Sequence, residues 1–228
     1  MGVRLHFVVE GQTEETFVNR VLVPHLSGGE VWADVRRVET SRGAARIHRG
    51  GGRRYEAIKK DLHRWMKQDQ RDNVWFTTMF DLYGLRRFRD EFPGMAEAGK
   101  QVRSDARVQV LEKAFNADIG HQRFLPYLQL HEFEALVLVD PDGFRGEFDD
   151  CEEQVGRLHE LIEGYTSPEE INEGEETAPS KRIITLLPAY EGRKSSAGPI
   201  MAERTGLPRL REKCPHFNEW ITKLEALG

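Results

Sequence analysis

Cysteine is scarce in this chain of 228 residues: Cys151 and Cys214 are the only two, and they stand far apart. Because there is no Cys-x-x-Cys pair, the sequence encodes neither a zinc knuckle nor a dithiol redox site. It also lacks a Walker motif, a dinucleotide-binding glycine pattern and a Ser-His-Asp signature. These absences exclude the ATPases, dehydrogenases and serine hydrolases that such motifs define.

Long apolar runs and a positive net charge are also missing. No apolar stretch is long enough to span a bilayer, and the chain runs at once into a strand-like segment without the anatomy of a signal peptide. We therefore expect a cytoplasmic protein without a membrane partner. The formal net charge is -5, so binding to DNA or RNA would have to depend on a local basic surface.

Strand-like and helical patterns alternate along the first part of the chain. Their order is 3–9 (strand), 31–38 (strand), 55–67 (helix), 74–80 (strand), 102–115 (helix) and 124–130 (strand). Such alternation predicts an α/β fold, a mainly parallel sheet flanked by helices. We expect this core to occupy residues 1–142, and a mostly helical C-terminal region, residues 143–228, to pack on it.

Local signals predict where several elements begin and end. Thr13 is expected to cap the first helix, and Pro24 to end it. In the C-terminal region, residues 152–162 predict a helix and residues 169–176 predict a mobile loop. The remaining breaks in the helical tail are expected at its prolines: Pro188, Pro199, Pro208 and Pro215.

Two carboxylates each follow an apolar strand. Glu10 comes directly after the first strand and precedes Gly11 and a helix start, and Asp81 ends the third strand-like run. In open α/β sheets, ligands bind at the carboxyl ends of the strands. Carboxylate oxygens suit Mg²⁺ or Mn²⁺, so the pair predicts a shared cation site. Alternatively, Glu10 is a solvated turn residue and Asp81 caps a turn.

Glu132 and Glu134 follow the last strand-like run and are candidates for further metal ligands. If the strand continues, both side chains lie on one face. If a helix begins at His131, that residue and Glu134 are neighbours instead. The alternative to a functional role is a solvated helix start with acidic residues in its first turn.

Basic residues gather around the triple glycine at residues 50–52. A glycine-rich loop that carries guanidinium groups suits contact with phosphate backbones. Lys181 is a candidate for stabilising charge on a phosphate. Without a functional role, all of these are ordinary solvated charges. The residues predicted to bind nucleic acid are Arg46, Arg49, Arg53, Arg54 and Arg182.

Together these segments resemble the Toprim domain of topoisomerases, primases and OLD-type nucleases, and a bacterial family of Toprim-like proteins more closely. The resemblance rests on Glu10-Gly11-Gln12-Thr13-Glu14, Asp81-Leu82-Tyr83-Gly84-Leu85, Pro126-Tyr127, His131-Glu132-Phe133-Glu134, Pro179-Ser180-Lys181-Arg182 and Cys214-Pro215-His216-Phe217. The Toprim pattern usually has Asp-x-Asp after the later strand, and Tyr83 stands here in place of the second Asp.

The resemblance implies a metal-dependent nuclease that hydrolyses phosphodiester bonds in DNA or RNA. Glu10 would act as general acid–base or metal ligand, Asp81 as a metal ligand, and Glu132 or Glu134 would add an oxygen. It further implies a phage-defence effector with a separate ATPase partner. Two rival interpretations remain open: a binding module that no longer cuts, which Tyr83 favours, and a phosphotransfer enzyme for small nucleotides.

Overall fold

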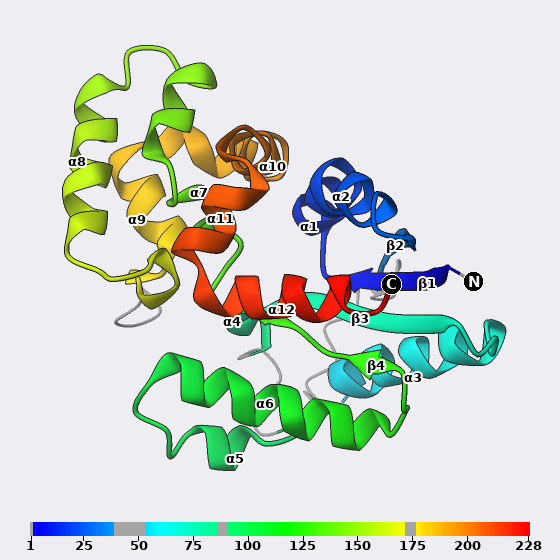
Figure 1. Ribbon diagram of the computed structural model, residues 1–228. Helices are drawn as coiled ribbons and strands as arrows, with labels where there is room; N and C mark the ends of the chain where they lie inside the picture. The colour runs from blue at the N-terminus through cyan, green and yellow to red at the C-terminus, as the bar shows by residue number, and fades with distance from the viewer. Residues whose placement is uncertain (1, 39–52, 86–90, 172–176) are drawn as a thin grey trace.

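The computed structural model describes residues 2–38, 53–85, 91–171 and 177–228 (Figure 1). The described elements of the N-terminal part are β1 (Val3–Val9), α1 (Gln12–Phe17), the π-helical turn η1 (Val18–Leu22), α2 (Val23–Ser27), β2 (Val31–Arg37), α3 (Arg53–Gln68), β3 (Val74–Asp81), α4 (Leu82–Leu85), α5 (Met95–Ala98), α6 (Ser104–Ile119), β4 (Phe124–Leu125) and β5 (Leu128–Gln129). Those of the C-terminal part are α7 (Glu134–Val137), η3 (Pro141–Gly146), α8 (Glu152–Glu163), η4 (Pro168–Glu170), α9 (Pro179–Leu186), η6 (Pro188–Arg193), α10 (Lys194–Thr205), α11 (Leu207–Lys213) and α12 (Pro215–Glu225).

The chain is an α/β protein with a parallel sheet, as the alternating patterns predict. Its order is β2-β1-β3-β4, and β5 also pairs with β3. Side chains alternate between the two faces of β1: Phe7 joins one apolar cluster and Val8 the other. Burial on both faces explains why these strands are nearly continuous apolar runs.

Helices cover both faces of the sheet (Figure 1). The first face carries α1, α2 and the C-terminal helices, whose apolar side chains form one cluster with those of β1. Phe7 of β1 and Trp220 of α12 meet edge to face, with ring centroids 5.8 Å apart. The second face carries α3 and α6. The helical C-terminal region therefore packs on the sheet through a shared core.

The last strand-like run forms two short strands instead of one, and Pro126 lies between them. The registers Thr77↔Leu125 and Phe80↔Leu128 have the same offset, so β4 and β5 follow one line beside β3. Proline has no N–H to donate to the ladder. Across the gap, the Thr78 hydroxyl donates to the Tyr127 carbonyl at 3.0 Å and accepts from the Tyr127 N–H at 3.0 Å.

Two predicted features of the first helix are wrong. Gly11, not Thr13, is the N-cap, and Glu14 at the third helical position accepts a hydrogen bond from the Gly11 N–H at 2.8 Å. Pro24 does not end the helix, because it lies in the first turn of α2, which continues to Ser27. The wider π-helical turn η1 directly precedes α2. It interrupts the regular α-helical hydrogen bonds, which are the bonds that a proline would break.

Among the prolines of the tail, Pro199 departs from expectation. Pro188, Pro208 and Pro215 lie in first turns, where a missing N–H costs little. Pro199 instead lies inside α10, which packs on α1 and α7. This tertiary packing outweighs the local preference of proline. The predicted helix at residues 152–162 is confirmed as α8.

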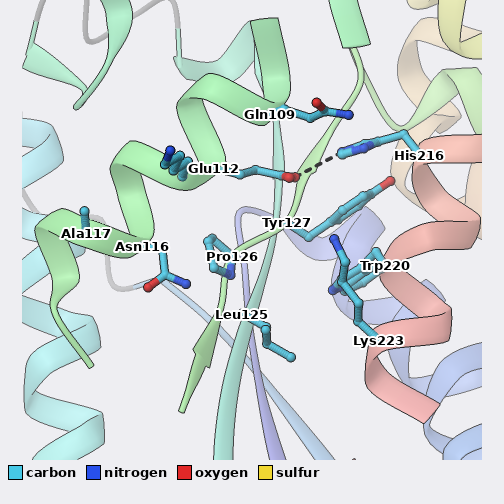
Figure 2. Close-up of a pocket in the computed structure, with 11 residues that line it drawn as sticks. Gln109, Glu112, Asn116, Ala117, Leu125, Pro126, Tyr127, His216, Trp220 and Lys223 are labelled. Carbon is cyan, nitrogen blue, oxygen red and sulfur yellow. Dashed lines mark hydrogen bonds and ion pairs between the residues drawn. The ribbon is translucent and has the colours of Figure 1, made fainter. Parts of the chain in front are cut away.

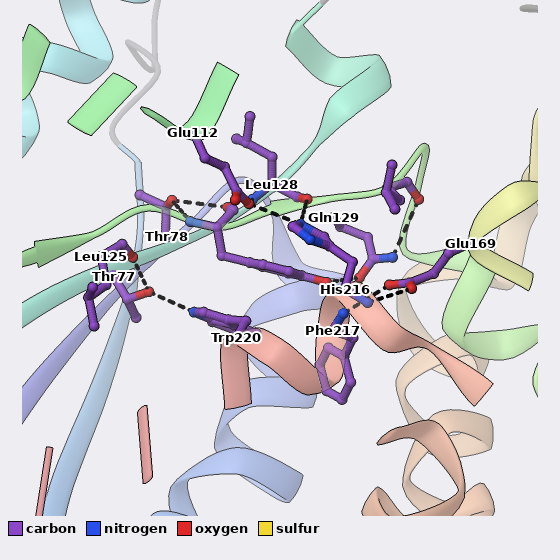
Figure 3. Close-up of polar contacts among 12 residues, drawn as sticks. Thr77, Thr78, Glu112, Leu125, Leu128, Gln129, Glu169, His216, Phe217 and Trp220 are labelled. Atoms are coloured by element: carbon purple, nitrogen blue, oxygen red, sulfur yellow. Dashed lines mark hydrogen bonds and ion pairs between the residues drawn. The ribbon is translucent and has the colours of Figure 1, made fainter. Parts of the chain in front are cut away.

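The segment expected to be a mobile loop begins with a buried anchor. Glu169 is 2% exposed, and its carboxylate accepts hydrogen bonds from the backbone N–H groups of His216 at 2.9 Å and Phe217 at 3.0 Å (Figure 3). It therefore caps the start of α12 from a distant part of the chain. The prediction was wrong for Glu169, while residues 172–176 lie outside the described residues.

A buried imidazole joins α6, β5 and α12. His216 Nε2 lies 3.0 Å from Glu112 Oε1 and 3.2 Å from the Leu128 carbonyl oxygen, and both are acceptors, so Nε2 carries the proton. Burial alone would lower the pKa of His216. The hydrogen bond and charge of Glu112, with the charge of Glu169, outweigh burial and raise this pKa above 6.5.

We expect Glu169→Ala to lower the free energy of unfolding by about 2–3 kcal/mol, because two buried N–H groups lose a charged acceptor. The adjacent Glu170→Ala is the matched control, since Glu170 is exposed, and its effect should stay within about 0.5 kcal/mol. Urea unfolding measures the free energy of unfolding of both variants and of wild type. Equal effects would show that the Glu169 carboxylate does not stabilise α12.

We expect the stabilisation by His216 to decline as pH rises. A raised folded-state pKa means that the charged imidazole stabilises the fold below the unfolded value of 6.5, and that this contribution is lost as pH passes the folded value. The difference in unfolding free energy between wild type and His216→Gln should therefore shrink between about pH 6 and pH 9. A difference that grows with pH would contradict the charge pairing with Glu112.

Candidate carboxylate site at the sheet edge

Glu10 and Asp81 lie at the same edge of the sheet, as their positions in the sequence predict. Glu10 directly follows β1, and Asp81 is the last residue of β3. The two strands are parallel neighbours with Val9 in register with Met79. The carboxyl ends of both strands therefore bring these side chains to one edge, where ligands bind in open α/β sheets.

Gly84 leaves the space that the Glu10 carboxylate occupies. A Cβ atom at position 84 would lie 2.9 Å from Glu10 Oε1 and closer still to Oε2. Real Cβ atoms do not approach oxygen so closely, so any larger residue in α4 would displace the Glu10 side chain. Replacing this glycine, which stands three positions after Asp81, would thus move Glu10, so the end of β1 and the β3–α4 turn form one unit.

Asp81 is the most strongly perturbed carboxyl of the edge. Its Oδ1 is buried and accepts no hydrogen bond from any described residue. Burial raises the pKa of Asp81 well above its usual range, and the charges of Glu14, Glu10, Glu134 and Glu132 raise it further. All four glutamates are thus near enough to interact with Asp81.

Glu14 belongs to this group, although the sequence analysis did not select it. It is 6% exposed, and burial together with the charges of Glu10 and Glu134 raises its pKa to about 7. The hydrogen bond from the Gly11 N–H fixes one of its oxygens. Its place three residues after Gly11 was the available signal, since a glutamate at the third helical position commonly accepts from the N-cap N–H.

Glu134 and Glu132 both reach the edge, through a geometry that neither expected alternative describes. The strand ends at Gln129, His131 has a left-handed φ of 64°, and α7 begins at Glu134. Burial raises the pKa of Glu134 to about 7, while the Lys194 ammonium opposes the shift. The turn at His131 therefore replaces both a continued strand and a helix that starts there.

Residues of the C-terminal region hold these two carboxylates. Glu132 Oε2 accepts from the Ser180 backbone N–H at 2.9 Å, at the start of α9. Glu134 Oε1 accepts from the Tyr190 hydroxyl at 3.4 Å and lies 3.8 Å from Lys194 Nζ. The site therefore depends on both parts of the chain, and Tyr190 and Lys194 were missed because only the folded chain brings them to the sheet.

The predicted basic residues fall into three groups. Lys181 is exposed in the first turn of α9, next to the Ser180 that binds Glu132. Arg182 binds within the C-terminal region, through the Thr177 carbonyl at 2.8 Å and the Tyr165 hydroxyl at 3.3 Å. Arg46 and Arg49 lie outside the described residues, and only the backbone is described for Arg53 and Arg54.

Tyr83 stands two residues after Asp81, where the resemblance would place a second aspartate. Its backbone N–H donates to the His131 carbonyl at 3.0 Å, and the two rings are tilted together with centroids 5.9 Å apart. Tyr83 therefore links the β3–α4 turn to the turn that positions Glu132 and Glu134. It contributes a structural contact here and no carboxylate.

The oxygen-rich donor set fits a hard divalent cation better than zinc. Within the described part of the chain, no three Asp, Glu, His or Cys side chains are arranged as a ready metal-ligand set. Hydrogen bonds turn Glu14 and Glu132 toward backbone N–H groups. Mg²⁺ is commonly held by one or two carboxylates and keeps several waters, so Asp81 and Glu10 suffice as protein ligands for such a site.

A separate cavity of about 480 Å³ lies between α6 and α12 (Figure 2). Its floor is formed by Leu125, Pro126 and Tyr127, and the Glu112–His216 pair crosses it. None of the five edge carboxylates lines this cavity. Chemistry that needs several acidic oxygens therefore belongs to the sheet edge and not to this cavity.

The comparison with protein families identifies one family. The model of "Domain of unknown function (DUF4276)" matches residues 9–225, so the chain belongs to this family. The match includes every edge carboxylate, from Glu10 to Glu134. A search of curated proteins and a search of solved structures each found no match.

No helix in the described ranges is both long and apolar enough to cross a membrane.

We expect Gly84→Ala to displace the Glu10 carboxylate while the fold stays intact. The added methyl group would occupy the space of two flexible side-chain oxygens and not of backbone atoms. A crystal structure of the variant should show Glu10 in a different rotamer, with the free energy of unfolding changed by less than about 1 kcal/mol. An unchanged Glu10 rotamer would show that Gly84 does not determine its position.

Proposed function

We propose that this protein is a metal-dependent nuclease that hydrolyses phosphodiester bonds in DNA or RNA. The observation that carries the proposal is a buried Asp81 oxygen with no described hydrogen-bond partner, near enough to Glu10, Glu14, Glu132 and Glu134 for their charges to raise the pKa of Asp81. Mutual repulsion makes such a group unfavourable without a counter-charge, and a divalent cation would supply it. The resemblance to Toprim nucleases agrees with this chemistry.

In the proposed reaction, Asp81 and Glu10 would hold Mg²⁺ or Mn²⁺ at the carboxyl edge of the sheet. The cation, when bound, would supply Lewis acidity to a phosphate oxygen and favour deprotonation of water. Glu134 and Glu132, whose charges also act on Asp81, would add oxygens or accept a proton from the attacking water. Lys194 near Glu134, or Lys181 at the start of α9, would stabilise negative charge on the phosphate.

The resemblance extends the proposal to a cellular setting. Toprim nucleases of this kind are paired with ATPases in phage defence, so we infer a cytoplasmic effector that works with a separate ATPase. We propose the ATPase as a separate partner, since these 228 residues contain no ATPase motif. A cleavage assay should therefore be run both on the purified chain and with candidate ATPases present.

A non-cutting binding module is the second candidate function, and Tyr83 is the observation that favours it. A tyrosine in place of the second aspartate removes one carboxylate from the pattern that the resemblance implies.

Parallel assays on oligonucleotides and mononucleotides also test the third possibility, a phosphotransfer enzyme for small nucleotides. Cleavage of mononucleotides alone would favour that enzyme over a nuclease.

We expect Asp81→Asn to abolish metal binding and cleavage without harming the fold. Without metal, the variant should be as stable as wild type or more stable, because it removes a carboxylate that four other carboxylates repel. Mn²⁺ should raise the melting temperature of wild type only. The cleavage rate should fall by roughly a hundredfold or more, since a lost ligand commonly costs several kcal/mol of transition-state stabilisation.

The matched control for this test is Asp149→Asn, which changes an exposed aspartate outside the site. It should behave as wild type in melting experiments with and without Mn²⁺ and in cleavage of labelled DNA and RNA with and without EDTA. If Asp81→Asn cuts as fast as wild type, Asp81 is not a catalytic ligand. If neither metal binding nor cleavage occurs with any substrate or partner, the binding module is the better account.

A further inference from the structure

We propose that the outer face of α3 is a surface that binds the phosphate backbone of DNA or RNA. This inference rests on the proposed function for its choice of ligand, and it concerns a different surface from the carboxylate edge. We call this surface the α3 stripe and define it by Lys60, Arg64 and Lys67, which are all exposed.

The α3 stripe concentrates positive charge in an acidic protein. Residues 53–68 contain six Lys and Arg and two Asp and Glu, which gives a net charge of +4, whereas the whole chain has -5. The residues outside 53–68 therefore carry a formal net charge of -9. A surface with this contrast attracts polyanions locally, even though the protein as a whole repels them.

The geometry of the helix lines these charges up. Positions 60, 64 and 67 have i, i+4 and i+7 spacing and lie on one side of α3. The opposite side packs into the core through Ile58, Leu62 and other apolar residues. Seven residues of α-helix span roughly 10 Å, and one strand of a duplex presents a phosphate about every 3.4 Å along its axis. The stripe is thus about as long as three phosphate steps of one strand.

The two lysines of the stripe differ from the neighbouring basic residues in their contacts. Lys59 Nζ lies 2.9 Å from Asp118 Oδ2 of α6, so this lysine holds two helices together. Arg36 donates from Nη2 to Asp61 Oδ1 at 2.5 Å and lies over the Trp65 ring. Arg64 lies 3.9 Å from the same Asp61 oxygen. Lys60 and Lys67 have no described carboxylate within ion-pair distance and therefore present their charge outward.

The direction of α3 connects the stripe to the candidate site. Arg36, near the end of β2, binds Asp61, while Trp65 lies beside His6, which is in register with Asp34. Later residues of α3 therefore contact earlier residues of the strands, so α3 runs antiparallel to the strands of the sheet. The N-terminal end of α3 lies toward the edge that holds Glu10 and Asp81, and the stripe occupies the half of the helix farther from that edge. A strand bound along α3 would point at that edge.

An open depression of about 800 Å³ follows the same face of the helix, and Lys60, Arg64 and Lys67 line it together with Glu56 and His63. The proposed ligand is the phosphate backbone and not the bases, because a row of charges attracts every phosphate alike and contacts to phosphate carry no sequence information. Binding should therefore depend weakly on nucleotide sequence and strongly on salt.

The test measures binding without relying on cleavage. Fluorescence anisotropy of labelled DNA and RNA is recorded in EDTA on the Asp81→Asn background, over a range of salt concentrations. Replacing Lys60, Arg64 and Lys67 with Ala should weaken binding at least tenfold and reduce the slope of log affinity against log salt by about two to three, as for the loss of three phosphate contacts. Replacing the same residues so as to keep the charge (Lys60→Arg, Arg64→Lys, Lys67→Arg) should preserve binding.

Removal of three exposed basic residues elsewhere, by Lys113→Ala, Arg209→Ala and Lys223→Ala, is the matched control and should leave the slope nearly unchanged. Equal losses in both triple variants, an unchanged slope in the α3 variant, or no binding of nucleic acid by the parent would overturn the inference. So would loss of binding to phosphatidylserine vesicles alone, since it would identify a lipid surface as the ligand.

The outcome for the α3 stripe is separable from that of the nuclease proposal. If wild type cleaves nucleic acid and the α3 variant binds as the parent does, the stripe is not the binding surface and the nuclease proposal stands. If the α3 variant loses binding but wild type never cleaves, the stripe stands and the binding module becomes the function of the protein.

Discussion

Repulsion among carboxylates at one edge of a parallel sheet is the constraint around which much of this structure is arranged. Four glutamates lie near enough to Asp81 for their charges to raise its pKa, and this mutual repulsion would disfavour the folded state if each carboxylate were left unsupported. The fold offsets part of this repulsion with backbone N–H groups at two helix starts, at Gly11 and Ser180, and with the Lys194 ammonium. Each support comes from a different element, so the edge can form only when the N-terminal sheet and the C-terminal helices have packed together.

The sequence predicted the part of the site that depends on local patterns. Glu10 and Asp81 could be selected because each directly follows an apolar strand, and the carboxyl ends of parallel strands meet at one edge. Glu14 carried a weaker signal, its place three residues after Gly11 at the start of a helix. Tyr190 and Lys194 carried none, because their contact with Glu134 joins residues far apart in the chain. Residues that reach a site through tertiary packing have no period or spacing from which they could be predicted.

The fold shows the same division between local and long-range effects. The order of strands and helices follows from periodicity, but the behaviour of individual prolines depends on context. Pro126 divides a strand because its neighbours form a ladder that needs an N–H, whereas Pro199 continues a helix whose packing on α1 and α7 outweighs the lost hydrogen bond. Glu169, in a segment of polar composition typical of a loop, is buried because α12 needs an acceptor at its start.

The presence of Tyr83, where the resemblance would place an aspartate, raises the question of how many acidic oxygens the edge requires. The loss of an aspartate there would weaken cation binding if the site held only the residues of the Toprim pattern. Glu14, Glu132 and Glu134 all interact with Asp81, however, so the edge is not short of negative charge. Tyr83 instead contacts His131, whose left-handed turn delivers Glu132 and Glu134 to the edge. A position that supplies a ligand in the pattern thus supports, in this chain, the turn that brings other carboxylates to the same place.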